Sequence, residues 1–262
     1  MTPGLETPTP SPLDLEEGRK RYAEVQARIE RAAQRAGRRL DEITLVGVAK
    51  KQPPGRTLAA ITAGLRVIGQ SYLQETREVR PLIEAALADD PAMSDVKLEW
   101  RMVGRLQSNK AALAARLFEA IETVDRPKLV RTLARHAAEE GRRLDVLIQV
   151  SLCGEVQKGG CRRDELATLA EQILATDALR LRGLMTIPAA NPDPEAARPV
   201  FRELRELRKV LSRLDPGLEQ PDLSMGMSAD LEVAVEEGAT LVRVGTALFG
   251  PRLEPPSPAS PA

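Results

Sequence analysis

The sequence predicts a single TIM-type α/β barrel of eight strands, preceded by an additional N-terminal helix. Short apolar runs alternate with helix-patterned segments along the chain, and about eight such units can be counted. Strands that alternate with helices form a parallel sheet that the helices cover. The length of 262 residues is normal for an undivided barrel of this kind.

The predicted strands are apolar runs bounded mostly by glycine, proline or charged residues. They comprise residues 43–49, 65–69, 96–104, 120–124, 145–151, 181–187, 222–226 and 241–245. Helical patterns occupy, among others, residues 126–141, 164–177 and 194–214. A doubly wound open sheet is the alternative architecture, but no Gly-x-Gly-x-x-Gly follows the first strand, where a dinucleotide-binding fold would carry it.

Residues 14–37 form the predicted N-terminal helix, because Tyr22, Val25 and Ile29 recur at helical spacing between charged residues. No linker interrupts residues 14–252, which we therefore expect to form one domain. Residues 1–13 and 253–262 are rich in proline, serine and threonine, so we expect two disordered tails.

The composition argues against several classes of function. Lys+Arg 38 balance Asp+Glu 38, so the chain lacks the excess of positive charge that nucleic-acid binding demands. Two cysteines, Cys153 and Cys161, cannot supply a disulfide framework or a four-ligand zinc site, and we expect free thiols. His136 is the single histidine and lies in a segment typical of a surface helix, so neither a histidine-based triad nor a metal site is expected.

The N-terminus has no basic start and no apolar run, which argues against a secretory signal. No window approaches the roughly 20 apolar residues that a membrane span requires. We expect a cytoplasmic protein.

Lys50 is the first candidate for chemistry, because it closes the first apolar run and active sites of barrels lie at the C-terminal ends of the strands. Partial desolvation there favours a neutral amine, which can condense with an aldehyde. Most lysines at strand ends are simply solvated. Lys51 is the better candidate for that role, since adjacent side chains of a strand point to opposite faces.

The last two strands end in segments rich in small and hydroxylated residues. The seventh continues into Ser224-Met225-Gly226-Met227-Ser228-Ala229-Asp230 and the eighth into Gly245-Thr246. Barrels build phosphate sites at these two exits, with Asp230 expected at the start of a helix. Each loop alone could be a simple turn, but both together, opposite a strand-end lysine, favour a phosphorylated aldehyde as ligand.

Arg243 lies within an apolar run, where a guanidinium is costly unless it has a partner. It could pair with a carboxylate of the barrel, which is the common fate of such arginines. Alternatively, it could donate a hydrogen bond to the ring nitrogen of a cofactor.

The chain resembles the YggS/PROSC family of pyridoxal phosphate homeostasis proteins, which are similar to the barrel domain of alanine racemase. The resemblance covers residues 18–252. It is carried, in order, by VGVAKKQP, IGQSYLQE, WRMVGRLQSNK, VDRPKL, IQVSLCGEVQKGG, LRGLMTIP, SMGMSADLEVAVEEGAT and VRVGTALFGPR.

The resemblance implies that the chain binds pyridoxal 5′-phosphate (PLP) covalently, with Lys50 as the Schiff-base lysine. It places Arg243 near the pyridine nitrogen. The remaining cofactor-binding residues that it implies are Ser71, Met225, Gly226, Ser228, Gly245 and Thr246.

Several positions depart from the family pattern. Ala49 replaces a serine, Gln70-Ser71 replaces Glu-Asn, Arg101 replaces a histidine and Ser151 replaces an asparagine. The change at Ser71 matters most, because the resemblance places this position near the cofactor ring.

We expect a monomeric carrier that buffers PLP or delivers it to apoenzymes, without metabolic catalysis. An arginine partner keeps the ring nitrogen unprotonated and so weakens the ring as an electron sink. The resemblance implies that racemases of this architecture use a tyrosine from a second domain, and we expect no such domain after Gly245 here. A racemase-like enzyme, or a barrel that binds a phosphorylated metabolite without a covalent bond, are the alternatives.

Two other side chains near the predicted strand exits carry less weight. Tyr72 could reach the barrel mouth, but we expect its ring to pack at the start of the following helix. Lys158 could be an exposed loop lysine, or a second amine that receives or releases the cofactor.

Overall fold

The computed structural model describes residues 8–154 and 158–251. Its eight strands form a closed parallel barrel in the order β1 to β8, which confirms the predicted fold class. The strands are β1 (Thr44–Val48), β2 (Val67–Gln70), β3 (Glu99–Met102), β4 (Ala120–Val124), β5 (Leu144–Gln149), β6 (Leu179–Met185), β7 (Asp222–Ser224) and β8 (Leu241–Val244). Each predicted strand is present, with ends shifted by a few residues.

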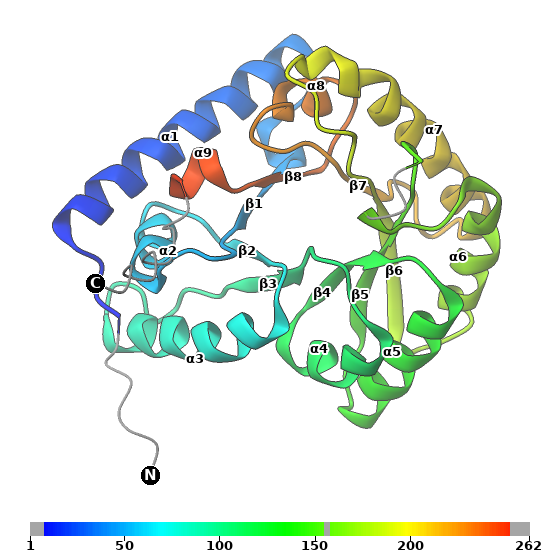
Figure 1. The fold of residues 1–262 in the computed structure, drawn as a ribbon, viewed down its shortest axis with the longest axis horizontal. Helices are drawn as coiled ribbons and strands as arrows, with labels where there is room; N and C mark the ends of the chain where they lie inside the picture. Colours follow the sequence, from blue (N-terminus) through cyan, green and yellow to red (C-terminus); the bar gives the residue numbers. More distant parts are fainter. Residues whose placement is uncertain (1–7, 155–157, 252–262) are drawn as a thin grey trace, which may run out of the picture.

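The helices follow the strands in alternation and surround the barrel (Figure 1). They are α1 (Pro12–Arg35), α2 (Pro54–Thr62), α3 (Leu73–Asp89), α4 (Ala111–Leu117), α5 (Pro127–Glu139), α6 (Leu166–Leu174), α7 (Arg198–Leu214), α8 (Leu231–Glu236) and α9 (Thr246–Phe249). Short 3-10 turns complete the connections: η1 (Leu40–Glu42), η2 (Ser108–Lys110), η4 (Arg163–Glu165) and η5 (Pro194–Ala197).

Helix α1 is the additional N-terminal helix, and it begins at Pro12, two residues before the expected start. Ser11 caps it: the Ser11 hydroxyl accepts from the Asp14 amide, and the Asp14 carboxylate accepts from the Ser11 amide. The helix runs beside α8 and α9 in Figure 1 and also packs on α2. Of the expected tails at 1–13 and 253–262, residues 1–7 and 253–262 lie outside the described part of the chain, and residues 12 and 13 belong to α1.

The barrel encloses its own apolar cluster, separate from the larger core between strands and helices. The inner cluster joins side chains from six different strands or strand ends, which can meet only inside the barrel. Its buried members are Val46, Val67, Val103, Leu147, Met185 and Leu241. Since side chains alternate along a strand, this cluster shows which residues of β1, β2, β5, β6 and β8, and of the end of β3, point inward.

Within the described ranges, no helix is both long and apolar enough to cross a membrane.

Candidate functional site

A cavity of about 310 Å³ opens at the C-terminal ends of β1, β2, β7 and β8. This is the end of the barrel at which the sequence predicted a site. Its volume lies at the lower end of the range of small-molecule sites, roughly 300–1,000 Å³. The described lining residues are Val48, Lys50, Gln52, Ser71, Val103, Ile187, Met227, Ser228, Ala229, Arg243, Gly245 and Thr246.

Lys50 lines this cavity because it continues the inward-facing series of β1. Val46 lies in the inner cluster and Val48 packs against it, so the position two residues further along also faces inward. Lys51 turns away: its backbone takes a positive φ of 56°, and its amide donates to Glu75 Oε1 at 2.6 Å. The Lys51 ammonium lies 5.9 Å from the centre of the Tyr72 ring. The two adjacent lysines are thus separated as the alternation predicted.

The loops that follow β7 and β8 meet at the cavity. The Ser228 hydroxyl accepts a hydrogen bond of 3.3 Å from the Ala247 amide, which joins the two loops directly. Asp230 precedes α8 as expected, but its carboxylate does not cap that helix; it accepts from the Met227 amide at 2.6 Å and closes the loop on itself. Burial raises the pKa of the Asp230 carboxyl, although the Met227 amide opposes the shift.

Helix α1 holds the Ser228 loop from outside the barrel. Arg28 donates to the Ser228 carbonyl at 2.9 Å and to both carboxylate oxygens of Glu232, at 2.6 and 2.8 Å. A two-point arginine–carboxylate contact fixes orientation as well as distance. The N-terminal helix therefore has a positioning role that its amphipathic pattern alone did not predict.

Arg243 forms the inner end of the cavity and is only 4% exposed. Its guanidinium donates to Ser224 Oγ at 2.7 Å and to the Thr186 carbonyl at 2.9 Å. Burial lowers the pKa of Arg243, and the negative charges of Glu122 and Asp230 oppose that shift. Because the group has specific partners, its burial in an apolar strand is explained.

Ser224 connects Arg243 to a buried carboxylate. Its hydroxyl donates to Glu122 Oε2 at 2.5 Å, and Arg101 donates to the other oxygen, Glu122 Oε1, at 3.1 Å. Glu122 is fully buried. The barrel carboxylate foreseen for Arg243 thus exists, but within the described structure the contact runs through a serine hydroxyl. Arg101, one of the departures from the family pattern, is its direct ion partner.

The structure places six of the eight predicted cofactor-binding residues around the cavity: Lys50, Ser71, Ser228, Arg243, Gly245 and Thr246. Met225 and Gly226, which were expected to help wall the cofactor, are not among the described lining residues of the cavity. Met225 points outward into the core around the barrel, because the inward position of β7 belongs to Ser224. At Gly226 the backbone turns with a positive φ of 90°, and Met227 and Ala229 form the wall in place of the two predicted residues.

Tyr72 and Lys158 lie outside the described cavity lining. Tyr72 is at the start of α3 as expected, but its ring is not packed away: it is 48% exposed. The Lys158 ammonium donates to the Pro188 carbonyl at 2.7 Å, and the Lys158 carbonyl accepts from Gln149 at 2.8 Å.

The donor set of the cavity fits a small anion that carries an aldehyde. Lys50 supplies an amine, Ser228 and Thr246 supply hydroxyls, and Val48, Val103 and Ile187 supply apolar walls. Apart from Gly245 itself and its two chain neighbours, the described atoms within 4 Å of a Cβ placed on Gly245 belong to Val48, at 3.4 and 3.9 Å, so a larger residue would fill cavity space.

Neither cysteine suggests a second chemistry. Both are free thiols, and burial raises the pKa of Cys161 to about 12, which keeps its thiol protonated and unreactive at neutral pH. No cluster of histidine, cysteine and carboxylate side chains suited to a metal ion occurs among the residues that could be searched, 8–154 and 158–251.

The family model of the alanine racemase N-terminal domain matches residues 22–253. A pyridoxal phosphate homeostasis protein from Pseudomonas aeruginosa is 42% identical over 230 residues, which cover 88% of this chain and 94% of the relative. A protein of the same name from Aquifex aeolicus is 40% identical over 233 residues, covering 89% and 97% of the two chains.

Among solved structures, PipY from Synechococcus elongatus with PLP bound superposes with a TM-score of 0.71. It is 34% identical and covers 85% of this chain and 100% of its own. An alanine racemase from Clostridium difficile shares the fold at 13% identity, with a TM-score of 0.62.

Proposed function

The chain belongs to the family of pyridoxal phosphate homeostasis proteins, and we propose that it binds PLP in the cavity at the ends of β1, β2, β7 and β8 and serves as a non-catalytic carrier. The observation that carries the proposal is the position of Lys50 in one small cavity with Ser228, Thr246 and Arg243.

Lys50 is the residue that we propose to hold the cofactor covalently. When bound, PLP supplies an aldehyde that condenses with an amine and releases water. The inward alternation of Val46, Val48 and Lys50 brings this amine to the cavity, whereas Lys51 is turned toward Tyr72. A covalent bond of this kind forms reversibly, so it suits storage and release.

We propose that Ser228, Gly245 and Thr246 hold the phosphate. The two loops are joined by the Ser228–Ala247 hydrogen bond, and α1 fixes the first of them through Arg28. Hydroxyl and amide donors to a phosphate form charge-assisted hydrogen bonds, which are about twice as strong as neutral ones. Met227 and Ala229, rather than Met225 and Gly226, then form the neighbouring wall.

Arg243 is the residue that we propose to face the pyridine nitrogen, with Ser71 on the side of β2. An arginine is always charged and can only donate hydrogen bonds, so it favours an unprotonated acceptor nitrogen. Such a nitrogen weakens the electron sink on which amino-acid chemistry depends. Among the described lining residues, the charged side chains are Lys50 and Arg243, which leaves few groups for proton transfer to a substrate.

We propose that the carrier acts as a monomer. The recipients that we propose are PLP-dependent apoenzymes, whose own lysine amines can take over the aldehyde by the same reversible condensation.

The test is intact-mass spectrometry of protein incubated with PLP, before and after borohydride reduction. The wild type and Lys51→Ala should retain one phosphopyridoxyl group after reduction, and Lys50→Ala should retain none. Equal labelling of the two alanine variants would overturn the assignment. In parallel, incubation with amino acids followed by chiral analysis should detect no turnover; measurable racemisation would replace the carrier with the racemase alternative.

A further inference from the structure

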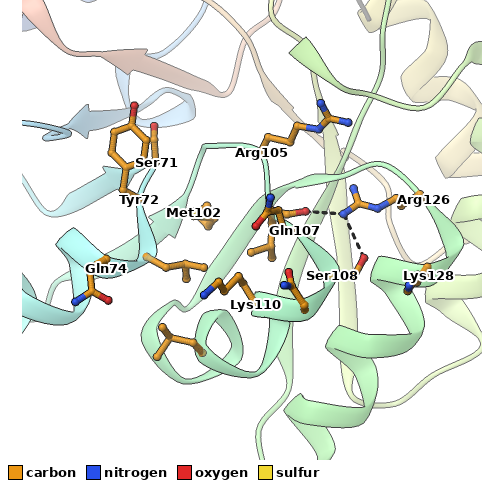
Figure 2. Close-up of a pocket in the computed structure, with 14 residues that line it drawn as sticks. Ser71, Tyr72, Gln74, Met102, Arg105, Gln107, Ser108, Lys110, Arg126 and Lys128 are labelled. Atoms are coloured by element: carbon orange, nitrogen blue, oxygen red, sulfur yellow. Dashed lines mark hydrogen bonds between the residues drawn. The ribbon is translucent and has the colours of Figure 1, made fainter. Parts of the chain in front are cut away.

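A second and larger pocket lies beside the cavity, on the same rim of the barrel. It has a volume of about 890 Å³ and is formed by the segment after β2, the segment from β3 into α4, and the start of α5 (Figure 2). Ser71 lines both the cavity and this pocket. The shared wall is tight, because a Cβ on Gly104 would approach the Ser71 carbonyl oxygen to 2.6 Å.

The charged side chains of this pocket are all positive. Arg105, Lys110, Arg126 and Lys128 line it, and its described lining includes no aspartate or glutamate. The whole chain has equal numbers of basic and acidic residues, so this is a local excess rather than a general property. We call this set of four residues the basic cluster.

One member of the basic cluster is fixed, and the other three have no partner among the residues that the structure describes. Arg126 pairs with Asp125 and donates to the Leu106 carbonyl at 2.6 Å and to Ser108 Oγ at 3.2 Å, as the dashed lines in Figure 2 show. The exposed side chains of Arg105, Lys110 and Lys128 make no hydrogen bond or ion pair with any residue in 8–154 or 158–251.

The three unpaired side chains come from different elements. Lys110 ends η2 and extends across the pocket toward the side of Gln74 in Figure 2, whereas Lys128 belongs to the first turn of α5. Arg105 lies in the connection after β3 and also borders a neighbouring cleft that contains Asp125 and Asp164. Arg126 pairs with Asp125, and Arg105 also borders a cleft that contains carboxylates. Lys110 and Lys128 are therefore the two cations with no carboxylate among the described lining residues around them.

We propose that this pocket binds a phosphate monoester noncovalently, with Lys110 and Lys128 as the principal contacts to the phosphate. Lysine and arginine form charge-assisted hydrogen bonds to phosphate oxygens, and a dianion balances two unpaired cations. Ser108 and Asn109 add neutral polar groups, and Tyr72 and Leu113 add apolar surface for the rest of the ligand.

A small molecule is the occupant that the shape favours. The pocket is concave and its volume falls within the usual range for small ligands. An RNA or DNA strand requires an extended positive groove, which a chain of zero net charge with four clustered cations does not offer. The inference does not depend on covalent capture at Lys50, because the cavity and the larger pocket share only Ser71 among their described lining residues.

The experiment measures binding while the first cavity is blocked. Wild-type protein is loaded with PLP, reduced with borohydride, and titrated by calorimetry with pyridoxamine 5′-phosphate, inorganic phosphate and pyridoxamine. Pyridoxamine 5′-phosphate carries an amine in place of the aldehyde and so cannot condense with lysine. We expect saturable binding of the two phosphates at one site and none of pyridoxamine. If loading fails by intact mass, the proposed function fails separately, and the titration proceeds on untreated protein.

The double variant Lys110→Met/Lys128→Met should weaken phosphate binding by about tenfold or more, because it removes two charge-assisted contacts. The matched control is Lys20→Met/Lys97→Met, which removes the same charge from exposed positions on α1 and before β3. If phosphate binding weakens equally in both double variants, the effect is general electrostatics and the proposed site is wrong. The absence of saturable phosphate binding would also overturn the site, as would cluster-dependent binding of a short oligonucleotide without binding of pyridoxamine 5′-phosphate.

Discussion

The cavity and the larger pocket, both on the C-terminal rim of the barrel, differ in how their positive side chains are paired. In the cavity, the guanidinium of Arg243 is buried and bonded to Ser224 and Thr186, and a carboxylate stands behind it. In the larger pocket, Lys110 and Lys128 are exposed and have no described partner. A buried charge needs partners within the protein, whereas an exposed charge is solvated by water until a ligand binds.

The difference extends to how each hollow is built. The cavity residues Lys50, Arg243 and Gly245 follow from the inward alternation of β1 and β8, so their positions are set by the barrel. Most of the pocket residues, including Lys110 and Lys128, lie on connections or first turns of helices. We therefore expect substitutions behind the cavity to affect folding, and substitutions of Lys110 and Lys128 to affect binding alone.

The largest expected effect comes from Glu122→Ala, which removes the carboxylate shared by Arg101 and, through Ser224, by Arg243. Leaving buried cations without their partner should lower the free energy of unfolding by about 3–5 kcal/mol. The control is Glu99→Ala, since Glu99 also pairs with Arg101 but is 37% exposed, and its loss should cost about 0–1 kcal/mol.

Urea denaturation of the cofactor-free proteins measures both values. Lys110→Met/Lys128→Met should stay within about 0.5 kcal/mol of wild type, because exposed substitutions without internal partners are usually near neutral. If Glu122→Ala is no less stable than Glu99→Ala, the buried hydrogen bonds from Glu122 through Ser224 to Arg243 do not support the cavity.

The sequence predicted the cavity residues well, but only where alternation along a strand sets the direction of each side chain. Alternation along β1 separated Lys50 from Lys51, and the isolated arginine in β8 marked an inward position. The same signal, one charge in an apolar strand, was present for Glu122 and could have identified it. Its hydrogen bond with Ser224 could not be found, because Ser224 lies 102 residues away in sequence.

The sequence was less informative where strands end and turns begin. Met225 points outward by alternation with Ser224, and the positive φ of Gly226 then redirects the chain, so that Met227 lines the cavity. The basic cluster was also missed, because Lys110 and Lys128 line the same pocket only through the tertiary packing of separate connections. Neither lysine stands in a local pattern that differs from an ordinary solvated surface.

The next largest effect concerns the hydroxyls of the cavity. Ser228→Ala or Thr246→Ala should each weaken noncovalent retention of PLP by roughly 1–3 kcal/mol if the hydroxyl bonds the phosphate. The measurement is equilibrium dialysis in a Lys50→Ala/Lys110→Met/Lys128→Met background, where covalent capture and binding in the larger pocket are both excluded. Retention that neither hydroxyl substitution weakens would contradict the assignment of the phosphate to Ser228 and Thr246.

A smaller effect is expected from salt. The Debye length falls from about 10 Å at 0.1 M to about 3 Å at 1 M, so exposed charges are screened much more than buried ones. Phosphate binding to the larger pocket should therefore weaken several-fold over this range, while the fraction of protein labelled at Lys50 should change little. Calorimetry and intact mass on the same samples provide the two readings. Pocket binding that is insensitive to salt would contradict the exposed-cation model.

The smallest effect is a pH dependence that belongs to the cavity side alone. Burial raises the pKa of Asp230, so the folded protein holds this proton more tightly than the unfolded chain does. Stability then falls as the pH rises from about 4, the unfolded value, through the raised pKa of the folded state, and the decline ends above it. Asp230→Asn removes the titration but keeps an oxygen for the Met227 amide, so its advantage over wild type should grow with pH in this window. Denaturation midpoints from pH 4 to 7 test this. Lys110→Met/Lys128→Met should follow the wild-type curve, because the described lining of the larger pocket contains no carboxylate.

The contradicting outcome is a constant difference in stability between Asp230→Asn and wild type across this pH range. It would mean that the Asp230 carboxylate is hydrated in the folded protein. The loop that closes the cavity would then be more open than its hydrogen bonds indicate.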